Sequence, residues 1–210
     1  MTQPHHADRL PPGPTPSPRL ERLPALLERS AALHRHLCPR QVLGARTGLL
    51  AGQWLDLDFP RTDKRVLVFV ETDGCFADGV SVASGCWLGR RTMRLVDHGK
   101  VAATFVDTRT GRAVRIAPRP DLRARVREGR PEGQKRWDAY LAAYQTWPDE
   151  ELFTAQPVRL TLDLAALISV PGVRAVCSRC GEEIINGREV AAPGETLCRG
   201  CAGERYWAPG

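Results

Sequence analysis

The stretch QVLGARTGLLAGQW (residues 41–54) places Gly44, Gly48 and Gly52 at intervals of four residues. Residues four positions apart lie on the same face of an α-helix, so the three glycines would form one stripe. Because each glycine inside a helix costs about 1 kcal/mol relative to alanine, such a stripe needs a reason. We interpret it as a face against which another backbone packs closely, and we expect a helix over 41–54.

The sequence around this helix predicts a mixture of helices and strands. Leucines at three- and four-residue steps predict a helix over 20–37, which Pro39 ends. The run Val66–Val70 predicts a strand. Further strands are expected at 92–97, 101–107, 113–117 and 158–164, and further helices at 78–83, 119–130 and 133–147. Since these elements do not repeat as βαβ units, the sequence predicts an α+β core domain over residues 20–168, with helices against an antiparallel sheet.

Composition and charge limit the class of protein. The chain has 210 residues, a formal net charge of +6 and a sequence pI of about 9.2. Residues 1–19 are rich in proline and polar side chains, so we expect a disordered tail there and no signal peptide. No apolar run is long enough to cross a bilayer, and Arg46, Gln53 and Asp56 interrupt the glycine-striped helix. We expect a cytoplasmic protein without a membrane partner, because thiols at metal spacing fit a reducing compartment.

Basic and aromatic residues are concentrated between residues 119 and 147. The basic run 119–130 lacks interleaved aromatic residues, so we interpret it as a solvated surface rather than a single-strand nucleic-acid interface. A stripe of Trp137, Tyr140, Leu141 and Tyr144 follows at helical spacing. We interpret this stripe as core packing, which is its commoner role.

Four cysteines near the C-terminus form two CxxC pairs separated by 17 residues: Cys177, Cys180, Cys198 and Cys201. Two such pairs can hold one tetrahedral Zn²⁺ through four thiolates, whereas a redox dithiol would need only one pair. The surrounding segment has little apolar surface, so metal binding would supply its folding free energy. The sequence predicts a structural zinc finger over 173–207.

A second group of metal-ligating residues lies in the predicted core. His34, His36 and Cys38 fall within five residues, and Cys75 follows a predicted strand with Asp78 close behind. One interpretation gathers these residues into a second metal site or a thiolate–imidazole pair. In the other, the cysteines, with Cys86, are buried small hydrophobic residues, and the histidines cap a helix or face solvent. The residue types alone do not decide between these two interpretations.

Several segments resemble the family of the formylmethanofuran dehydrogenase E subunit. Residues 34–39 (HRHLCP) are similar to the HGHxCPG motif that opens the family's pattern, and 42–44 (VLG) continue it. The likeness spans roughly residues 25–165. Its remaining blocks are 71–78 (ETDGCFAD), 84–86 (SGC), 97–100 (DHGK) and 110–114 (TGRAV).

The resemblance implies an α+β core that commonly dimerises and, in some members, a C-terminal treble-clef zinc finger. It also implies that His36, Cys38 and Cys75 line a shared cleft, so we take these three as candidate catalytic residues. The residues assigned to cofactor binding around them are His34, Asp78 and Cys86.

The chain departs from the family pattern at several positions. Arg35 and Arg40 replace glycines of the opening motif. After Cys86, Trp87 replaces a threonine, and Arg90 stands where a lysine is usual. Large cationic side chains in place of glycine would narrow the cleft or make it more positively charged.

Three functions follow from the sequence and the resemblance. The first, which the resemblance favours, is a metal-binding homodimer that is accessory to a molybdenum-type redox enzyme and its partner subunits. The second is a stand-alone enzyme that uses a metal or thiolate at Cys38, His36 and Cys75. The third is a zinc-finger regulator of nucleic acid or RNA polymerase, which the glutamates of the finger do not favour. The chain lacks the cysteine series of an iron–sulfur ferredoxin, so we do not expect it to perform the dehydrogenase reaction alone.

Overall fold

The computed structural model describes residues 20–168, 172–208 and 210. The tail expected at 1–19 lies outside the described residues. The chain divides into two compact units, with the division between Arg159 and Leu160. Within the described part of the chain, no helix has the length and apolar character that a membrane span requires.

The first unit is built on a five-stranded sheet with the order β2-β1-β3-β4-β5. Its strands are β1 (Val66–Val70), β2 (Met93–Leu95), β3 (Ala103–Asp107), β4 (Ala113–Pro118) and β5 (Phe153–Val158). The pair β1–β2 is parallel and the other pairs are antiparallel. The expectation of an α+β core is confirmed, although the sheet is of mixed rather than purely antiparallel orientation.

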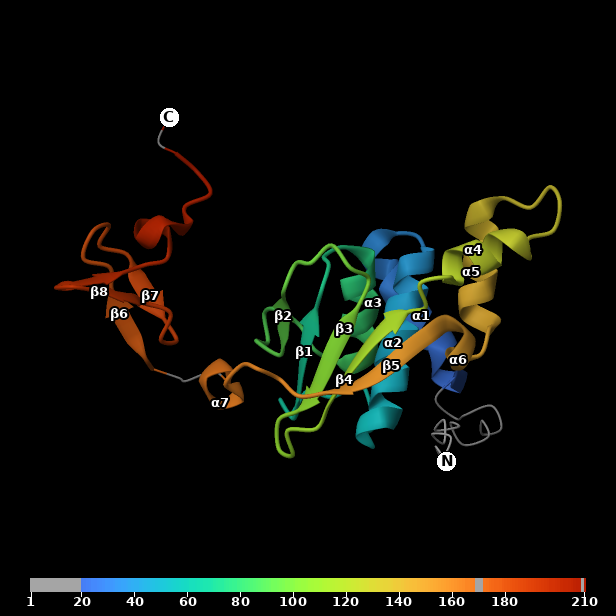
Figure 1. Cartoon of the computed structure of the whole chain (residues 1–210), viewed down its shortest axis with the longest axis horizontal. Coiled ribbons are helices and arrows are strands. Elements are labelled where there is room, and N and C mark those ends of the chain that lie inside the picture. The colour runs from blue at the N-terminus through green and yellow to red at the C-terminus, as the bar shows by residue number, and fades with distance from the viewer. Residues whose placement is uncertain (1–19, 169–171, 209) are drawn as a thin grey trace, which may run out of the picture. The chain divides into compact units, whose positions relative to one another are not determined.

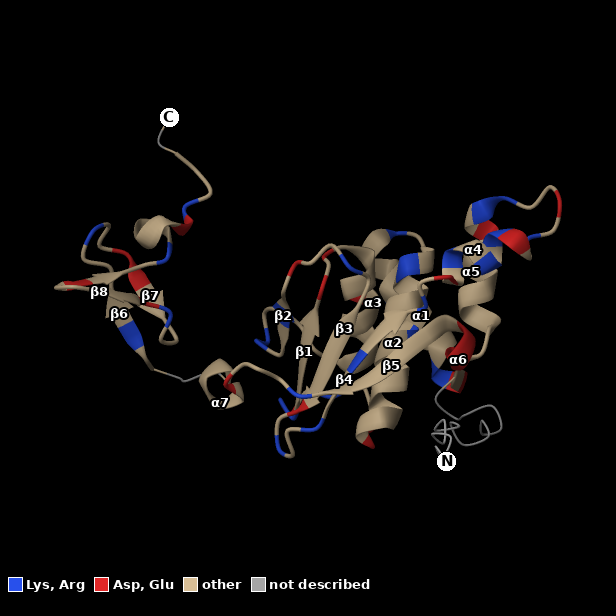
Figure 2. Cartoon of the chain, in the orientation of Figure 1, with Lys and Arg blue, Asp and Glu red and all other residues tan. Residues whose placement is uncertain are grey.

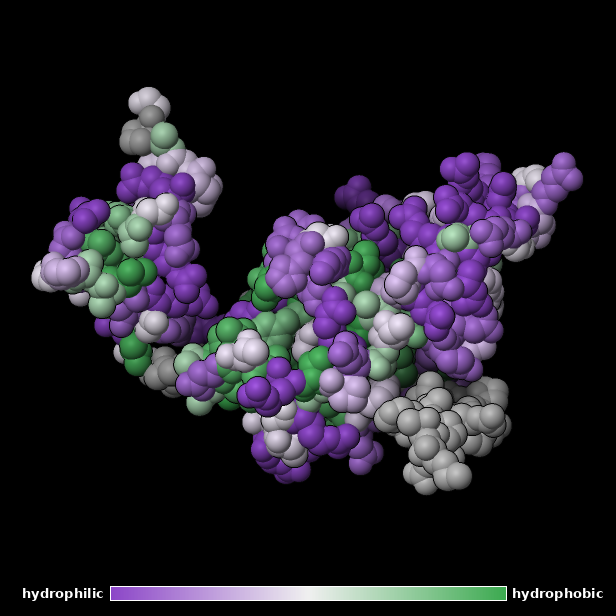
Figure 3. Space-filling view, viewed as in Figure 1, coloured by the Kyte–Doolittle hydropathy of each residue, from purple (hydrophilic) through white to green (hydrophobic). Residues whose placement is uncertain are grey.

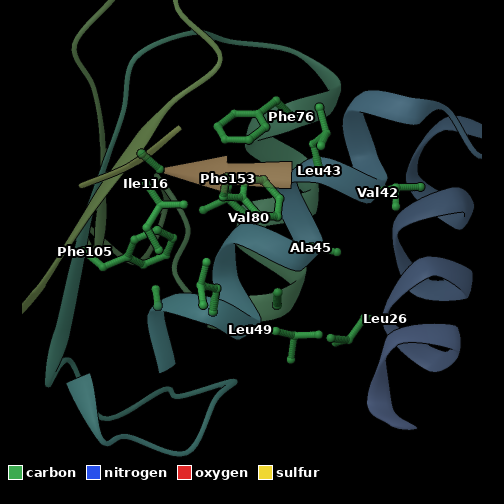
Figure 4. Close-up of a cluster of buried hydrophobic side chains, with 14 of the residues drawn as sticks. Leu26, Val42, Leu43, Ala45, Leu49, Phe76, Val80, Phe105, Ile116 and Phe153 are labelled. Atoms are coloured by element: carbon green, nitrogen blue, oxygen red, sulfur yellow. The ribbon is translucent and has the colours of Figure 1, made fainter. Parts of the chain in front are cut away.

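Three helices lie on one side of this sheet (Figure 1), two of them next to the strands and the first packed against the other two. They are α1 (Leu23–His34), α2 (Pro39–Leu55) and α3 (Cys75–Ser84). Valines of β1 and Phe105 of β3 pack against Val80 of α3 and Leu49 of α2, in one continuous apolar cluster (Figure 4). Burial of this cluster is the main stabilising contribution to the unit.

Two glycines of the stripe, Gly44 and Gly48, form the contact surface between α2 and α3. A β-carbon added at Gly44 would lie 2.2 Å from the carbonyl oxygen of Phe76, and one added at Gly48 would lie 2.6 Å from the β-carbon of Ala83. The close packing expected from the sequence is therefore present for these two glycines. Gly52 has a different neighbour, because its β-carbon would lie 2.9 Å from the carbonyl oxygen of Leu57. The missing side chain at Gly52 leaves room for the backbone that follows α2 and folds back against it.

Three short helices lie between β4 and β5 and form a helical insertion: α4 (Leu122–Glu128), α5 (Arg136–Thr146) and α6 (Asp149–Leu152). Buried Arg46 of α2 holds this insertion. Its guanidinium donates to the carbonyl oxygens of Tyr144, Gln145 and Trp147, at 3.1, 3.3 and 2.9 Å. It also forms an ion pair with Asp149 at 2.6 Å. The C-terminal end of α5 is thereby fixed to the middle of α2.

The expected helices and strands are present with ends that differ by up to three residues, apart from the strand expected at 158–164. The helix expected to reach residue 37 ends at His34, where Arg35 takes a left-handed conformation with φ of 60°. The strand expected at 158–164 is wrong, because the last strand is Phe153–Val158. Pairing with β4 runs from Phe153–Pro118 to Val158–Ala113, so β4 has no residue left to pair beyond Val158. The leucines that follow alternate without a partner strand, and Leu162 is 51 % exposed.

The second unit consists of a helical turn, two hairpins and a second turn. The turn α7 (Leu164–Leu167) precedes the hairpins, and Gly200–Glu204 follows them. The hairpins are β6 (Arg174–Val176) with β7 (Glu183–Ile185), and β8 (Val190–Ala192) with β9 (Glu195–Leu197). Its buried apolar cluster contains only Cys177, Ile184 and Leu197 among the residues that the structure describes.

Candidate functional site

Cys38 is the N-cap residue of α2, and a reciprocal capping box fixes its side chain. The Cys38 backbone N–H donates to Gln41 Oε1 at 2.7 Å, while the Gln41 backbone N–H donates to Cys38 Sγ at 3.4 Å. Gln41 also donates through Nε2 to the Ser30 carbonyl oxygen at 2.7 Å, which ties the cap to α1. The thiol is thus held at the positive end of a 17-residue helix.

Cys75 is the first residue of α3 and lies at the same end of the helix pair as Cys38. The contacts along α2 and α3 advance in the same direction, because Gly44 meets Phe76 and Gly48 meets Ala83. The two N-termini are therefore neighbours. Burial raises the pKa of the Cys75 thiol, and a hydrogen bond with Cys38 raises it further. In the absence of a metal, Cys75 is a neutral thiol at pH 7.

Both thiols line a cavity of about 620 Å³, which is the size of a small-molecule site. His36 lines it as well, so the structure brings together the three residues taken as catalytic candidates. Much of the remaining lining comes from the helical insertion and the segment that leads into it. The other lining residues are Pro39, Arg40, Leu43, Val101, Pro118, Arg119, Pro120, Leu122, Arg123, Arg136, Trp137, Tyr140 and Tyr144.

Two hydrogen bonds orient the histidines beside this cavity. His34 Nε2 lies 2.5 Å from Asp78 Oδ2, which links the end of α1 to the first turn of α3. His36 Nδ1 lies 2.9 Å from the His34 carbonyl oxygen and donates to it. In neutral His36 this bond leaves Nε2 with a free lone pair, able to act as a base or a metal ligand. His34 and Asp78 pair with each other and do not themselves line the cavity.

Cys86 lies away from this cavity, in the apolar cluster of the core. Its thiol is 1 % exposed and donates to the Val66 carbonyl oxygen at 3.4 Å. Burial raises its pKa. The structure therefore does not bring Cys86 to the other candidate residues, and its contacts are those of a packing residue.

The core residues are not gathered at metal-coordination distances in this conformation. Over residues 20–168, 172–208 and 210, only the C-terminal cysteines bring three or more possible ligand atoms within 4.8 Å of one another. Cys38, Cys75 and His36 share the cavity without forming such a cluster. A metal held by all three would have to draw them together.

The C-terminal cysteines fit a tetrahedral ion. Four thiolates at about 2.3 Å from a zinc ion lie about 3.8 Å apart. Cys180 Sγ and Cys198 Sγ are 3.9 Å apart, and all four sulfur atoms lie within 4.8 Å of one another. The Cys198 backbone N–H donates to Cys177 Sγ at 3.3 Å, and this bond, with further backbone N–H groups of Cys180 and Arg179, lowers the Cys177 pKa to about 6. The donor set and its spacing are those of a zinc finger.

The helical insertion contributes functional candidates that the sequence analysis missed. Arg136, Tyr140 and Tyr144 stand at four-residue steps on α5 and all line the cavity. We expected the aromatic stripe to be core packing, and this holds for Tyr144, which is buried in the core cluster, and for Tyr140 and Leu141, which pack against it. Trp137 is the exception, at 48 % exposed. The available signal was the alignment of a basic residue with aromatic residues on one helix face. Burial raises the pKa of Tyr144 to about 12, so its hydroxyl stays protonated.

The fold and these two sites define a protein of two parts, an α+β core domain whose cavity is lined by two cysteines and a histidine, and a four-cysteine finger. The family model described as "FmdE, Molybdenum formylmethanofuran dehydrogenase operon" matches residues 33–154. The model described as "Prokaryotic dksA/traR C4-type zinc finger" matches residues 172–206. Because the first match covers more than half of the sequence, the chain belongs to the FmdE family.

Two further proteins are similar to this chain. A protein of Archaeoglobus fulgidus described as "Probable S-adenosyl-L-methionine-binding protein" is 29 % identical over 208 residues, covering 88 % of this chain. The match covers 54 % of that protein, so the chain spans about half the length of this curated relative. The crystal structure of an FmdE-like protein from Syntrophus aciditrophicus, named for tungsten formylmethanofuran dehydrogenase, matches with a TM-score of 0.59 and 20 % identity. The alignment covers 89 % of this chain and 95 % of that one, and establishes a common fold.

Proposed function

We propose that this chain is a metal-binding protein whose core cavity holds a soft metal ion between Cys38, Cys75 and His36. The observation that carries the proposal is the position of two thiols at adjacent helix N-termini in one cavity. Thiolates and imidazoles are the ligands that zinc and other soft or borderline ions prefer. Because burial raises the pKa of Cys75, the bound ion itself would displace the thiol proton, as metal ions do when they bind thiolates.

The free Nε2 of His36 would complete a three-residue ligand set with an open position toward the cavity. An open coordination position is the feature that separates a working metal site from a structural one. The His34–Asp78 pair would stand beside the metal site, and through the His34 carbonyl it fixes the His36 ring. Outer hydrogen bonds of this kind orient the ligating imidazole and tune its basicity.

Metal analysis of purified protein tests this proposal. We expect two metal equivalents per chain for the wild type, one in the finger and one in the core. Cys38→Ser and Cys75→Ser should each retain only the finger metal. Cys86→Ala is the matched control, because its thiol packs in the core, and should retain two. A wild type with a single equivalent, unchanged by Cys38→Ser, would overturn the core metal site.

The role that family membership suggests for this metal protein is accessory to a molybdenum-type redox enzyme in the cytoplasm. Support comes from the family description alone, and the chain would act with partner subunits rather than perform the oxidation itself. Deleting the gene should lower molybdenum-dependent oxidoreductase activity in extracts, and the wild-type gene but not Cys38→Ser should restore it. Unchanged activity in the deletion strain would contradict the accessory role. Light scattering tests the proposed homodimer, for which twice the chain mass of 23.2 kDa is expected.

A stand-alone enzyme with Cys38 or Cys75 as nucleophile is the second candidate, and the cavity of substrate size favours it. The raised pKa of Cys75 argues against this residue as an unassisted nucleophile, because the thiolate is the reactive form. Alkylation of metal-free protein followed against pH separates the two candidates. A fast reaction at neutral pH that Cys38→Ser abolishes would favour the enzyme over the metal site.

A further inference from the structure

The cavity that holds the two thiols has a strongly basic lining. Arginines from α2, from the segment after β4 and from α4 and α5 contribute to it: Arg40, Arg119, Arg123 and Arg136. No aspartate or glutamate is among the described lining residues. In Figure 2 the ribbon of α4 and of the start of α5 is coloured mainly for basic residues, with some acidic ones between them, and Figure 3 shows that this part of the surface is hydrophilic. Such a lining attracts an anion into the cavity.

Two of these arginines have no partner within the described part of the chain. Neither Arg40 nor Arg136 forms an ion pair or a side-chain hydrogen bond with residues 20–168, 172–208 or 210. Arg119 has an exposed ion pair with Asp121 at 3.3 Å, and Arg123 lies over the Tyr140 ring at 5.4 Å. Arg40 and Arg136 are therefore available to bind a ligand without breaking an existing contact.

Helix geometry adds to this positive potential. The first residues of α3 and α5, Cys75 and Arg136, line the cavity, as do Pro39 and Arg40 in the first turn of α2. Neither α3 nor α5 has a side-chain cap on its first backbone N–H groups. Uncapped N–H groups at a helix N-terminus and arginine guanidinium groups both donate hydrogen bonds to phosphate oxygens, so together they favour phosphate binding.

The α5 side of the cavity also carries flat apolar surface. Trp137 is 48 % exposed on α5, and the rings of Tyr140 and Tyr144 lie 5.7 Å apart with a tilt of 30°. Trp137 both lines the cavity and is exposed, and aromatic ligands stack on exposed aromatic rings. A phosphate alone would leave this surface unused.

From these features we propose that the cavity binds a phosphate-bearing heteroaromatic compound of nucleotide size, with the phosphate at Arg40 and Arg136 and the ring on Trp137. The volume of about 620 Å³ accommodates such a molecule and is in the range of small-ligand sites. The bound compound shares the cavity with Cys38 and Cys75. This inference rests on the proposed function only because both use the same cavity. Neither arginine is a metal ligand, so the two proposals can fail separately.

Titration of the full chain with AMP, followed by calorimetry and tryptophan fluorescence, tests the assignment. Adenosine lacks the phosphate, and ribose 5-phosphate lacks the heteroaromatic base. Each should therefore bind at least about tenfold more weakly than AMP. Raising the salt concentration should weaken AMP binding more than adenosine binding. S-adenosylmethionine carries the adenine with a net positive charge, and tighter binding of this compound than of AMP would overturn the proposal.

Variants locate the site. Arg136→Ala and Arg40→Ala should each weaken AMP binding about tenfold, the loss expected for a charged hydrogen bond, and leave adenosine binding nearly unchanged. Trp137→Ala should weaken AMP and adenosine alike. Arg127→Ala is the matched control, because this exposed arginine of α4 does not line the cavity, and it should bind AMP like the wild type.

Two outcomes would contradict the assignment. One is the absence of binding by AMP, GMP and flavin mononucleotide at concentrations up to about 1 mM. The other is AMP binding that Arg40→Ala and Arg136→Ala affect no more than Arg127→Ala does. Cys38→Ser distinguishes this proposal from the core metal site, since loss of the core metal with AMP binding retained would leave the ligand assignment standing. Retained metal with no nucleotide binding would overturn the ligand assignment alone.

Discussion

Gly44 of α2 lies directly against Gly79 of α3. A β-carbon added at Gly44 would come within 3.1 Å of the Gly79 α-carbon, and one added at Gly79 would come within 2.3 Å of the Gln41 carbonyl oxygen. The two helices can approach this closely only because neither residue has a side chain. Their N-termini then meet, and Cys38 and Cys75 line the same cavity.

Replacing Gly44 with alanine should therefore destabilise the protein. Helix propensity alone predicts a gain of about 1 kcal/mol for this substitution. The clash with backbone atoms of α3 should outweigh that gain, and overpacking of this kind costs about 1–3 kcal/mol. Urea denaturation measures the difference. Gly89→Ala is the control, because nothing lies within 4 Å of its added β-carbon, and a Gly44→Ala protein as stable as this control would refute the close contact.

The features that sequence predicts well here are those fixed by local spacing. The stripe of Gly44 and Gly48 follows from helical periodicity, and the close packing that it predicts is present at both residues. The cysteine finger follows from two CxxC pairs at ribbon spacing, and its four sulfur atoms do cluster. In both cases the chemistry of a short segment leaves few alternative structures.

The basic and aromatic lining of the cavity could not be predicted in the same way. Arg136 is about a hundred residues from Cys38 in sequence, and only the tertiary fold brings them to one cavity. A basic residue beside an aromatic one on a helix is common on solvated surfaces, so its pattern does not identify a site. The strand mistakenly expected at 158–164 illustrates the same limit, since strand ends depend on the partner strand, here β4.

The position of the helical insertion depends on Arg46, and its loss should be costly. Arg46→Met keeps most of the side-chain volume but leaves three carbonyl oxygens and Asp149 without their buried donor. We expect a loss of about 3–5 kcal/mol in the free energy of unfolding. Arg46→Lys keeps the charge but cannot reach all four acceptors, so it should fall between Arg46→Met and the wild type.

Chemical denaturation of both variants measures this effect. Arg22→Met supplies the control, because Arg22 forms an exposed ion pair with Asp58 and such pairs contribute about 0–1 kcal/mol. If Arg46→Met were no less stable than Arg22→Met, the guanidinium would not anchor α5. AMP binding by Arg46→Lys would give a second readout, since a displaced α5 should weaken it.

Metal removal should unfold the finger and leave the core intact. The buried apolar cluster of the second unit comprises Cys177, Ile184 and Leu197 among the described residues, which is too small to stabilise it without a metal. We expect chelation, or Cys198→Ser, to expose residues 172–208 to limited proteolysis while residues 20–158 remain protected. Mass spectrometry of the fragments locates the cuts. Cys86→Ala should keep the wild-type pattern, and equal protection of the finger with and without chelator would show that the metal does not hold it.

Stability should fall at acid pH because of Asp107. Its carboxylate accepts from Arg65 Nε at 3.2 Å and Nη2 at 3.1 Å, and also from the Arg109 backbone N–H and the Thr110 hydroxyl. These donors, Arg65 first, lower the pKa of Asp107 to about 2 from the ordinary 3.8. A lowered folded-state pKa stabilises the protein above about pH 4, and this contribution of about 2 kcal/mol is lost as the pH falls toward 2.

Comparing Asp107→Asn with the wild type across this range isolates the effect. The variant should be less stable at neutral pH, and its deficit should shrink steadily as the pH falls from about 4 to about 2. Urea denaturation at fixed pH values measures the deficit. Asp73→Asn changes the net charge by the same amount at an exposed residue, so it should track the wild type at every pH. A deficit of Asp107→Asn that is equally large at neutral and acid pH would mean that the lost interactions do not depend on the ionised carboxylate.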